Sequence, residues 1–331
     1  MPAAIAGQLA QDANRPLAGR GGSPSPGSSG GGIRFGHYEV SSLIGRGGMA
    51  AVYRGTALEG RWRGRPVAIK RLLPELVKDE AYVTRFLREA ALSQQLSHPY
   101  IVTVYESGIV DGAHFIAMEL VDGRDLAQVI RRCADLGIRL PVDFAVFLAH
   151  VLLEALESAH QAQGPDGTPL GIVHCDVSPS NLFISRTGDI KLGDFGVARS
   201  AAAGHSTEIV AGKPYYLSPE VIDGRVGPEA DLWAAAATLY ELLTLHRPFA
   251  GERAEEVFEA ICHGRRRPVR ELRPEVPEPL AALLERAFSP STRRRFPTAA
   301  SFAQELEAHY DERVGTPLGI AAVVRGLFGL R

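Results

Sequence analysis

Three side chains whose oxygen atoms suit metal binding or base catalysis occur in two short clusters. Asp176 and Asn181 lie five residues apart in His174-Cys-Asp-Val-Ser-Pro-Ser-Asn181, and Asp194 follows thirteen residues later in Asp194-Phe-Gly196. Carboxylate and amide oxygens are ligands that the hard cation Mg²⁺ prefers. If two of these residues hold the metal, one carboxylate is left to orient or deprotonate a hydroxyl nucleophile.

A glycine-rich turn and a lysine nearer the N-terminus supply groups that bind phosphates. In Gly45-Arg-Gly-Gly-Met-Ala-Ala-Val52, the glycines let backbone N–H groups approach phosphate oxygens. Lys70 ends the apolar run Val67-Ala-Ile69, and Glu89 in the following helix-like stretch can hold its ammonium by an ion pair. The turn alone is weak evidence for a phosphate-binding site, because many such turns are only hairpins. Together with the carboxylates, these groups are the parts that phosphoryl transfer needs.

The elements that must position these residues divide the chain into a strand-rich part and a helical part. Residues 38–120 are strand-rich, with one helix expected at 79–96 because apolar residues recur near helical spacing. After Asp122 we expect helices at 142–162, 229–245 and 279–288, and short strands at 182–185 and 190–192. The pattern predicts an α+β fold with a small strand-rich lobe, a connection near 119–124 and a larger helical lobe.

The composition limits the class of protein. The chain has 331 residues and a net charge of −2, so the charge balance does not favour nucleic acid or an anionic membrane as partner. Its three cysteines are far apart and odd in number, as expected for a reducing cytoplasm rather than a disulfide framework. We find no signal peptide and no apolar stretch long enough to span a bilayer.

Three segments are expected along the chain. Residues 1–34 are rich in Gly, Ser and Pro and predict a disordered leader, because they offer little apolar surface to offset the entropy of ordering. Residues 35–310 form the folded domain, with lobes at about 35–120 and 122–310. Residues 311–331 form a short tail with a predicted amphipathic helix, which either packs on the domain or, less favoured, contacts a membrane surface.

The four motifs, in this order and spacing, resemble those of eukaryotic-like (Hanks-type) bacterial serine/threonine protein kinases over residues 36–310. The resemblance implies a bilobal protein-kinase fold, ATP as phosphate donor and Mg²⁺ as metal, with Mn²⁺ as an alternative. Asp176 then matches the catalytic base, Lys70 and Glu89 the phosphate-binding ion pair, and Asn181 and Asp194 the metal ligands. Residues matching the nucleotide site are Ile44, Gly45, Gly47, Gly48, Val52, Ala68, Lys70, Met118, Glu119, Val121, Asp125 and Phe183.

Further matches lie in the predicted large lobe. Ser218-Pro-Glu220 resembles the end of the family's activation segment, and Asp231-Leu-Trp233 resembles the start of its central buried helix. Arg295 stands where a basic residue usually pairs with that glutamate. We expect a buried Glu220–Arg295 ion pair that anchors the segment.

The chain departs from the family pattern beside Asp176. Cys175 replaces an arginine that usually receives an activation-loop phosphate, so phosphorylation of Ser200, Ser206 or Thr207 should act weakly. The favoured interpretation is a simple loss of arginine, and a redox-sensitive thiol is the alternative.

A second departure concerns positive charge. Ser178 replaces the family lysine that neutralises the transferring phosphate, while Lys213 occupies a position that is usually threonine. We therefore hypothesise that Lys213 returns the missing charge to the site. The alternative is that Lys213 faces solvent or contacts substrate. Ser93, one turn after Glu89, replaces a larger apolar residue that usually stacks toward Phe195, which should weaken the active arrangement.

The leading functional prediction is phosphorylation of Ser or Thr hydroxyls on protein substrates, in the cytoplasm, with a regulatory protein partner supplying the input. A pseudokinase that acts as a nucleotide-binding scaffold is the second hypothesis, supported by the departures above. A small-molecule phosphotransferase is the third, and the complete segment from Asp194 to Glu220 argues against it.

Overall fold

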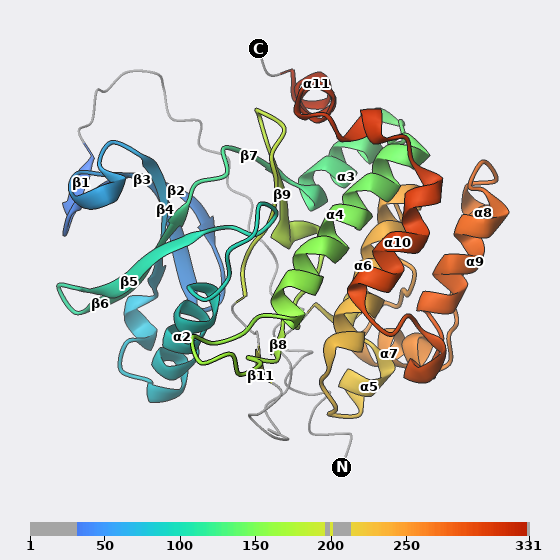
Figure 1. Ribbon diagram of the computed structural model, residues 1–331, viewed down its shortest axis with the longest axis horizontal. Coiled ribbons are helices and arrows are strands. Elements are labelled where there is room, and N and C mark those ends of the chain that lie inside the picture. The colour runs from blue at the N-terminus through green and yellow to red at the C-terminus, as the bar shows by residue number, and fades with distance from the viewer. Residues whose placement is uncertain (1–31, 196–198, 201–212, 330–331) are drawn as a thin grey trace. The chain divides into compact units, whose positions relative to one another are not determined.

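The structure is a computed structural model that describes residues 32–195, 199–200 and 213–329. It divides into two compact units (Figure 1). Unit 1 contains the chain through Leu87, Val104–Leu120 and the short stretch Arg253–Glu255, and unit 2 contains the rest. The division between Leu120 and Val121 falls within the predicted connection at 119–124.

In its described residues, unit 1 contains an antiparallel sheet of six strands in the order β1-β2-β3-β4-β6-β5. The strands are β1 (Ile33–Phe35), β2 (Tyr38–Arg46), β3 (Ala50–Ala57), β4 (Pro66–Leu72), β5 (Val104–Val110) and β6 (Ala113–Glu119). Tyr38, Ile69 and Phe115 belong to the buried core on this sheet. The predicted strands at Val67–Ile69 and Phe115–Met118 are confirmed as parts of β4 and β6.

The sheet begins two residues before the predicted start of the folded domain at residue 35. Ile33 pairs with Val40 and Arg34 with Glu39 in a hairpin. Phe35 is buried, and its ring lies edge-on to Phe115 with 5.5 Å between the ring centroids. The predicted leader over 1–34 therefore extends too far, because this aromatic contact secures the first strand. The rest of that leader, residues 1–31, lies outside the described residues.

The helix α2 (Glu80–Ser93) is confirmed close to its predicted range, but it crosses the boundary between the units. Arg88–Thr103 belongs to unit 2, whereas we expected all of 35–120 to form the small lobe. The reason is tertiary pairing: the N–H of Val102 donates to the carbonyl of Leu192, and the N–H of Leu192 donates to that of Tyr100. These bonds tie the segment after α2 to the core of unit 2.

Unit 2 is mainly helical. Its helices are α3 (Leu126–Leu136), α4 (Val142–His160), α5 (Pro219–Ile222), α6 (Pro228–Thr244), most of α7 (Ala254–Cys262), α8 (Val269–Leu272), α9 (Glu278–Ala287), α10 (Ala299–Leu306) and α11 (Pro317–Phe328). The predicted helices at 142–162, 229–245 and 279–288 are confirmed as α4, α6 and α9. Along α6 nearly every side chain is buried, the pattern of a helix surrounded by protein.

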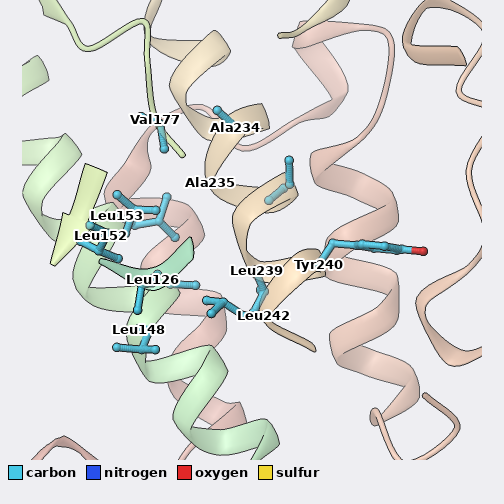
Figure 2. Close-up of a cluster of buried hydrophobic side chains, with 14 of the residues drawn as sticks. Leu126, Leu148, Leu152, Leu153, Val177, Ala234, Ala235, Leu239, Tyr240 and Leu242 are labelled. Atoms are coloured by element: carbon cyan, nitrogen blue, oxygen red, sulfur yellow. The ribbon is translucent and has the colours of Figure 1, made fainter. Parts of the chain in front are cut away.

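The core of unit 2 lies where α4 packs against α6 and α10. Leu148, Leu152 and Leu153 of α4 and Leu239 and Leu242 of α6 belong to one buried cluster, which Figure 2 shows. Burial of a leucine side chain contributes about 1.5–3 kcal/mol. This packing makes α6 a rigid support for the segments that contact it.

Short strands complete unit 2. Strands β7 (Gly123–Asp125), β9 (Leu182–Ser185) and β10 (Ile190–Leu192) form an antiparallel sheet in the order β10-β9-β7, and β8 (Ile172–Val173) pairs with β11 (Arg199–Ser200). The predicted strands at 182–185 and 190–192 are confirmed. Among the described residues, no helix combines the length and the apolar character that a bilayer crossing requires.

The predicted Glu220–Arg295 ion pair is confirmed. The Arg295 guanidinium donates to both carboxylate oxygens of Glu220, at 2.6 and 2.8 Å, and both side chains are buried. Arg295 also donates to the Ser289 carbonyl and lies over the Trp233 ring. A two-pronged contact of this kind fixes α5 against the body of unit 2.

We expect Arg295→Met to lower the free energy of unfolding by about 3–5 kcal/mol, because Glu220 would keep a buried charge without its partner. Chemical denaturation measures this loss. The double variant Glu220→Gln/Arg295→Met should recover part of it, because it removes the stranded charge. Equal losses in the single and double variants would contradict this account.

Candidate active site

Asp176 and Asn181 lie together in the loop between β8 and β9. The amide Nδ2 of Asn181 donates to the Asp176 carbonyl at 2.8 Å and to its carboxylate Oδ2 at 2.9 Å. A short 3-10 helix, Pro179–Asn181, brings the two side chains round to meet. Because Nδ2 is committed to Asp176, the other end of the Asn181 amide, Oδ1, is its acceptor end.

The loop is anchored by Asp231, which lies at the start of α6 and is 1% exposed. Its carboxylate accepts from the N–H of His174 at 2.8 Å, from the N–H of Cys175 at 2.9 Å and contacts His160 Nε2 at 2.8 Å. Cys175 has a φ of +64°, a conformation that costs energy for a side-chain-bearing residue. The Asp231 hydrogen bonds therefore offset the strain that turns the loop toward Asp176.

Burial would by itself raise the pKa of Asp231, but the hydrogen bond and charge of His160 and the interactions with His174 bring it below its ordinary value. Sequence reasoning placed Asp231 only at the start of a buried helix. The role of Asp231 as the loop's anchor was missed, because its partners lie 56 and 57 residues away in the chain. An acidic residue heading an otherwise buried helix was the available signal.

His174 joins the Asp176 loop to the segment that carries Asp194. Its Nδ1 accepts from the Asp176 N–H at 3.2 Å, so its Nε2 carries the proton and donates to the Gly193 carbonyl at 3.2 Å. The ring lies against Phe195, with 4.4 Å between ring centroids. The imidazole thus fixes the relative positions of the loop and the turn at Asp194.

Asp194 lies between two buried residues, Gly193 and Phe195, yet is itself exposed. Its φ is +63°, a sparsely populated conformation for a residue other than glycine. The N–H of Gly193 donates to the Asn181 carbonyl at 2.9 Å, which ties this turn to the metal-ligand candidate Asn181. The strained backbone presents the carboxylate outward while its neighbours stay in the core. Gly196, the last residue of the motif, lies outside the described residues.

Lys213 and Ser178 meet across the site. Lys213 Nζ donates to Ser178 Oγ at 2.7 Å and lies 3.4 Å from Asp176 Oδ2. Ser178 is 1% exposed, whereas the side chain of Lys213 is 40% exposed. The ammonium is thus directed at the loop, rather than only at solvent, and adds a positive charge beside Asp176.

The segment after Lys213 is secured by a buried tyrosine. Tyr216, in the 3-10 helix Pro214–Tyr216, donates its hydroxyl to Glu241 Oε2 of α6 at 2.5 Å. Burial, then the charge and hydrogen bond of Glu241, raise the pKa of Tyr216, and burial raises that of Glu241. This anchor was not predicted, because nothing local to Tyr216 reveals its partner.

Cys175 is half-buried, and its Sγ lies 3.5 Å from the Val173 carbonyl, as a thiol donor would. Both interpretations of Cys175, a simple loss of arginine and a redox-sensitive thiol, stay predictions. Of the three candidate phosphosites, Ser206 and Thr207 lie outside the described residues, and only the backbone of Ser200 is described, in β11.

Unit 1 carries the predicted phosphate-binding residues. Gly45, Gly47 and Gly48 lie where β2 turns into β3, and the Gly47 N–H donates to the Ala50 carbonyl at 2.8 Å. Lys70 does not end its strand, as the apolar run suggested, because β4 continues to Leu72.

Lys70 is 8% exposed and pairs with Val52 on one side and Ile116 on the other. Ala68 of β4 lies opposite Met118 of β6, and Glu119 ends β6. Ile44 is an exposed residue of β2. These predicted nucleotide-site residues therefore share one sheet, while Glu89 is a buried residue of α2 that belongs to unit 2.

Unit 2 carries the other predicted nucleotide-site residues. Asp125 pairs with Phe183 between β7 and β9, and Asp125 Oδ1 accepts from the Gln128 N–H at 2.8 Å to cap α3. Burial raises the pKa of Asp125. Val121 immediately precedes this sheet. The paired strands thus present Asp125 and Phe183 side by side.

The lowered pKa of Asp231 implies that it stabilises unit 2 above its ordinary pKa of 3.8 and that this stabilisation is lost as pH falls through its lower folded value. At pH 7 we expect Asp231→Asn to lower the free energy of unfolding by about 3 kcal/mol, because hydrogen bonds to a charged acceptor are lost. Melting temperatures of both proteins from pH 7 to pH 3 should converge below about pH 4. A constant difference over this range would contradict the charge's role.

Comparison with known proteins agrees with this geometry. A family profile described as the protein kinase domain matches residues 38–309. The chain is 36% identical to the tyrosine-protein kinase MasK of Myxococcus xanthus, over 89% of this chain and 46% of that protein. It is 38% identical to the serine/threonine-protein kinase PknL of Mycobacterium tuberculosis, over 66% of this chain and 51% of that protein.

Among solved structures, the kinase domain of Mycobacterium tuberculosis PknI matches with a TM-score of 0.64 and 27% identity, covering 85% of this chain and 99% of that one. The chain spans about half the length of the curated relatives it matches. Its fold is that of a protein kinase, with a sheet-containing unit and a helical unit. The chain therefore belongs to the protein kinase family, and its relatives include bacterial serine/threonine kinases of the Hanks type.

Proposed function

We propose that the protein transfers the γ-phosphoryl group of ATP to Ser or Thr hydroxyls of protein substrates, with Asp176 as the catalytic base. The observation that carries this proposal is the cluster at Asp176, where the Asn181 amide and the Lys213 ammonium converge on one carboxylate. Asp176 is held by these contacts and by the loop that Asp231 anchors. A positioned carboxylate beside a positive charge suits a hydroxyl nucleophile attacking a phosphate.

Asn181 and Asp194 would hold the magnesium ion, with manganese as an alternative. The fit rests on the donor set: the Asn181 amide is oriented by its bonds to Asp176, and the turn at Asp194 presents a carboxylate. Mg²⁺ usually takes one or two protein oxygens together with phosphate and water. When bound, the ion supplies charge neutralisation at the phosphates.

Each unit carries residues proposed to contact the nucleotide. In unit 1, the glycines of the β2–β3 turn offer backbone N–H groups to the phosphates, and Lys70 offers its ammonium, which Glu89 would pair. In unit 2, Asp125 would contact the ribose and Phe183 the adenine ring. The remaining apolar contacts and backbone groups of the predicted site are Ile44, Val52, Ala68, Met118, Glu119 and Val121.

Lys213 would supply the positive charge that the family draws from the position of Ser178. The proposal is supported by the 2.7 Å bond from Lys213 Nζ to the hydroxyl of Ser178, the residue that replaces the family lysine. A charge there favours a transition state with negative charge spread over phosphoryl oxygens more than the ground state. Lys213 therefore belongs with Asp176 among the proposed catalytic residues.

Ser or Thr is the proposed acceptor because the relatives PknL of Mycobacterium tuberculosis and the probable kinase of Streptomyces coelicolor are named serine/threonine-protein kinases. MasK is named a tyrosine-protein kinase, so tyrosine is the acceptor to test against. A cytoplasmic location is proposed from the sequence, whose three cysteines are far apart and odd in number, as expected in a reducing compartment. A regulatory protein partner remains part of the proposal.

The Asp176→Asn variant should lose phosphate transfer by a factor of about 10²–10⁴, because the general base is removed. The test incubates the protein and a generic protein substrate with labelled ATP and Mg²⁺, with and without chelator, and maps phosphosites by mass spectrometry. Incorporation only on tyrosine would overturn the acceptor proposal. Nucleotide-dependent thermal stabilisation without any incorporation by the wild type would support a pseudokinase instead.

The Lys213→Ala variant should lower kcat by about tenfold or more, because the charge beside the transferring phosphate is lost. Lys78→Ala, which removes an exposed lysine of unit 1, is the matched control. The double variant Ser178→Lys/Lys213→Thr should recover much of the rate by returning the charge to the loop. A Lys213→Ala rate within about twofold of wild type, less than roughly 0.4 kcal/mol in the barrier, would refute the role.

A further inference from the structure

The helix α11 lies beyond the segment that matches the protein kinase domain, residues 38–309, yet it is built into unit 2. Ile320, Ala321, Val324 and Leu327 form its buried face. On the opposite face Leu318 is 75% exposed. The predicted amphipathic tail helix thus packs on the protein through its apolar side.

The ends of α11 are defined by the sequence. Thr316 caps the N-terminus by accepting from the Gly319 N–H at 3.2 Å, and Pro317 occupies the first turn, where its missing N–H costs nothing. Gly329 ends the helix in the left-handed conformation, with φ of +61°. A helix limited at both ends in this way presents its buried face in one register.

Side-chain contacts tie α11 to the start of the helical region of unit 2. Arg132 of α3 donates through Nε to the Leu327 carbonyl at 2.8 Å. The guanidinium of Arg124, in β7, lies over the Phe328 ring, 5.1 Å from its centroid. An arginine over an aromatic face is attracted by the ring's negative face. These contacts join the end of α11 to β7 and α3.

The first residue of α11 and a residue of its last turn both contact the turn between β9 and β10. Arg325 donates to the Arg186 carbonyl at 3.2 Å. At Gly188, with φ of +96°, a Cβ atom would lie 2.0 Å from the Pro317 carbonyl oxygen. Only glycine fits at this approach, so the turn and the helix are built to touch. Figure 1 shows α11 beside the α3 end of unit 2, near β9.

The elements that α11 contacts are those that carry the proposed ribose and adenine contacts. Asp125 ends β7 and caps α3, and its strand partner Phe183 lies in β9. The two strands approach so closely at Gly123 that a Cβ there would lie 1.8 Å from the Ile184 carbonyl oxygen. A shift of β7 or of the start of α3 would therefore move Asp125 and Phe183 with it.

We infer that α11 is a positioning element for nucleotide binding, which holds β7, β9 and the start of α3 so that Asp125 and Phe183 keep their places. The inference rests on the proposed ATP-dependent activity. It assigns no catalytic contact to α11, whose residues act through Arg124, Arg132 and the β9–β10 turn. A helix with only a structural role would change stability, whereas a positioning helix changes the affinity for ATP more than the turnover rate.

The experiment compares two leucine substitutions on the same helix. Leu327→Asp places a charge on the buried face, where Leu327 is 6% exposed, and Leu318→Asp places the same charge on the exposed face. The measurements are the Kd for Mg-ATP, from displacement of a fluorescent ATP analogue, and the KM for ATP and kcat. All are made well below each variant's Tm.

For Leu327→Asp we expect Kd and KM for ATP to rise about tenfold while kcat at saturating ATP stays within about twofold. Leu318→Asp should match the wild type. Leu327→Met, which keeps an apolar side chain at this position, should retain the wild-type affinity for ATP. Phe328→Ala, which removes the ring beneath Arg124 with less disturbance of the fold, should raise Kd in the same direction and keeps the test valid if Leu327→Asp does not fold.

A lower Tm for Leu327→Asp and Phe328→Ala with unchanged Kd for ATP would overturn the inference and leave α11 a purely structural helix. Equal Kd increases in Leu318→Asp and Leu327→Asp would also overturn it. If the wild type binds Mg-ATP but transfers no phosphate, the proposed function fails, while the Kd values still decide the role of α11. Absence of ATP binding by the wild type would refute both.

Discussion

One buried carboxylate supports the loop that carries Asp176. Asp231 accepts from two consecutive backbone N–H groups, those of His174 and Cys175, and contacts His160. An ionised carboxylate in the interior is costly unless several donors satisfy it, and here the site's own loop supplies them. The loop therefore cannot move without exposing an unsatisfied charge, which explains how Cys175 keeps a strained backbone conformation next to Asp176.

The positive charge beside Asp176 comes from Lys213, which lies in a different segment from the loop. The ammonium of Lys213 comes from the segment that leads to Tyr216 and Glu220, rather than from the loop of Asp176 itself. The position of that charge thus depends on the contacts that secure its segment, the Tyr216 hydroxyl on Glu241 and Glu220 on Arg295. Both partners of these contacts are buried or half-buried, so the segment is held by interactions that are costly to break.

Helices of unit 2 support both the Asp176 loop and the strands that carry the proposed nucleotide contacts. Helix α6 is surrounded by protein and holds the loop through Asp231, while α11 packs near the β7–β9 strands that carry Asp125 and Phe183. Helix α6 thus serves the proposed phosphate transfer, and α11 serves the proposed nucleotide binding. Short polar segments are thereby held between well-packed helices, which is how a few loop residues can keep a defined geometry.

The sequence alone identified the family and predicted the longest helices and several strands, because motif spacing and apolar periodicity are local properties. The residues proposed to carry the chemistry also come from motif spacing. The sequence also indicated that Ser178 and Lys213 would be neighbours. Only the tertiary structure decided that 88–103 joins unit 2, that Lys70 lies inside its strand, and that Asp231 and Glu241 hold the site. Those outcomes depend on hydrogen bonds between residues distant in the chain, which no local pattern encodes.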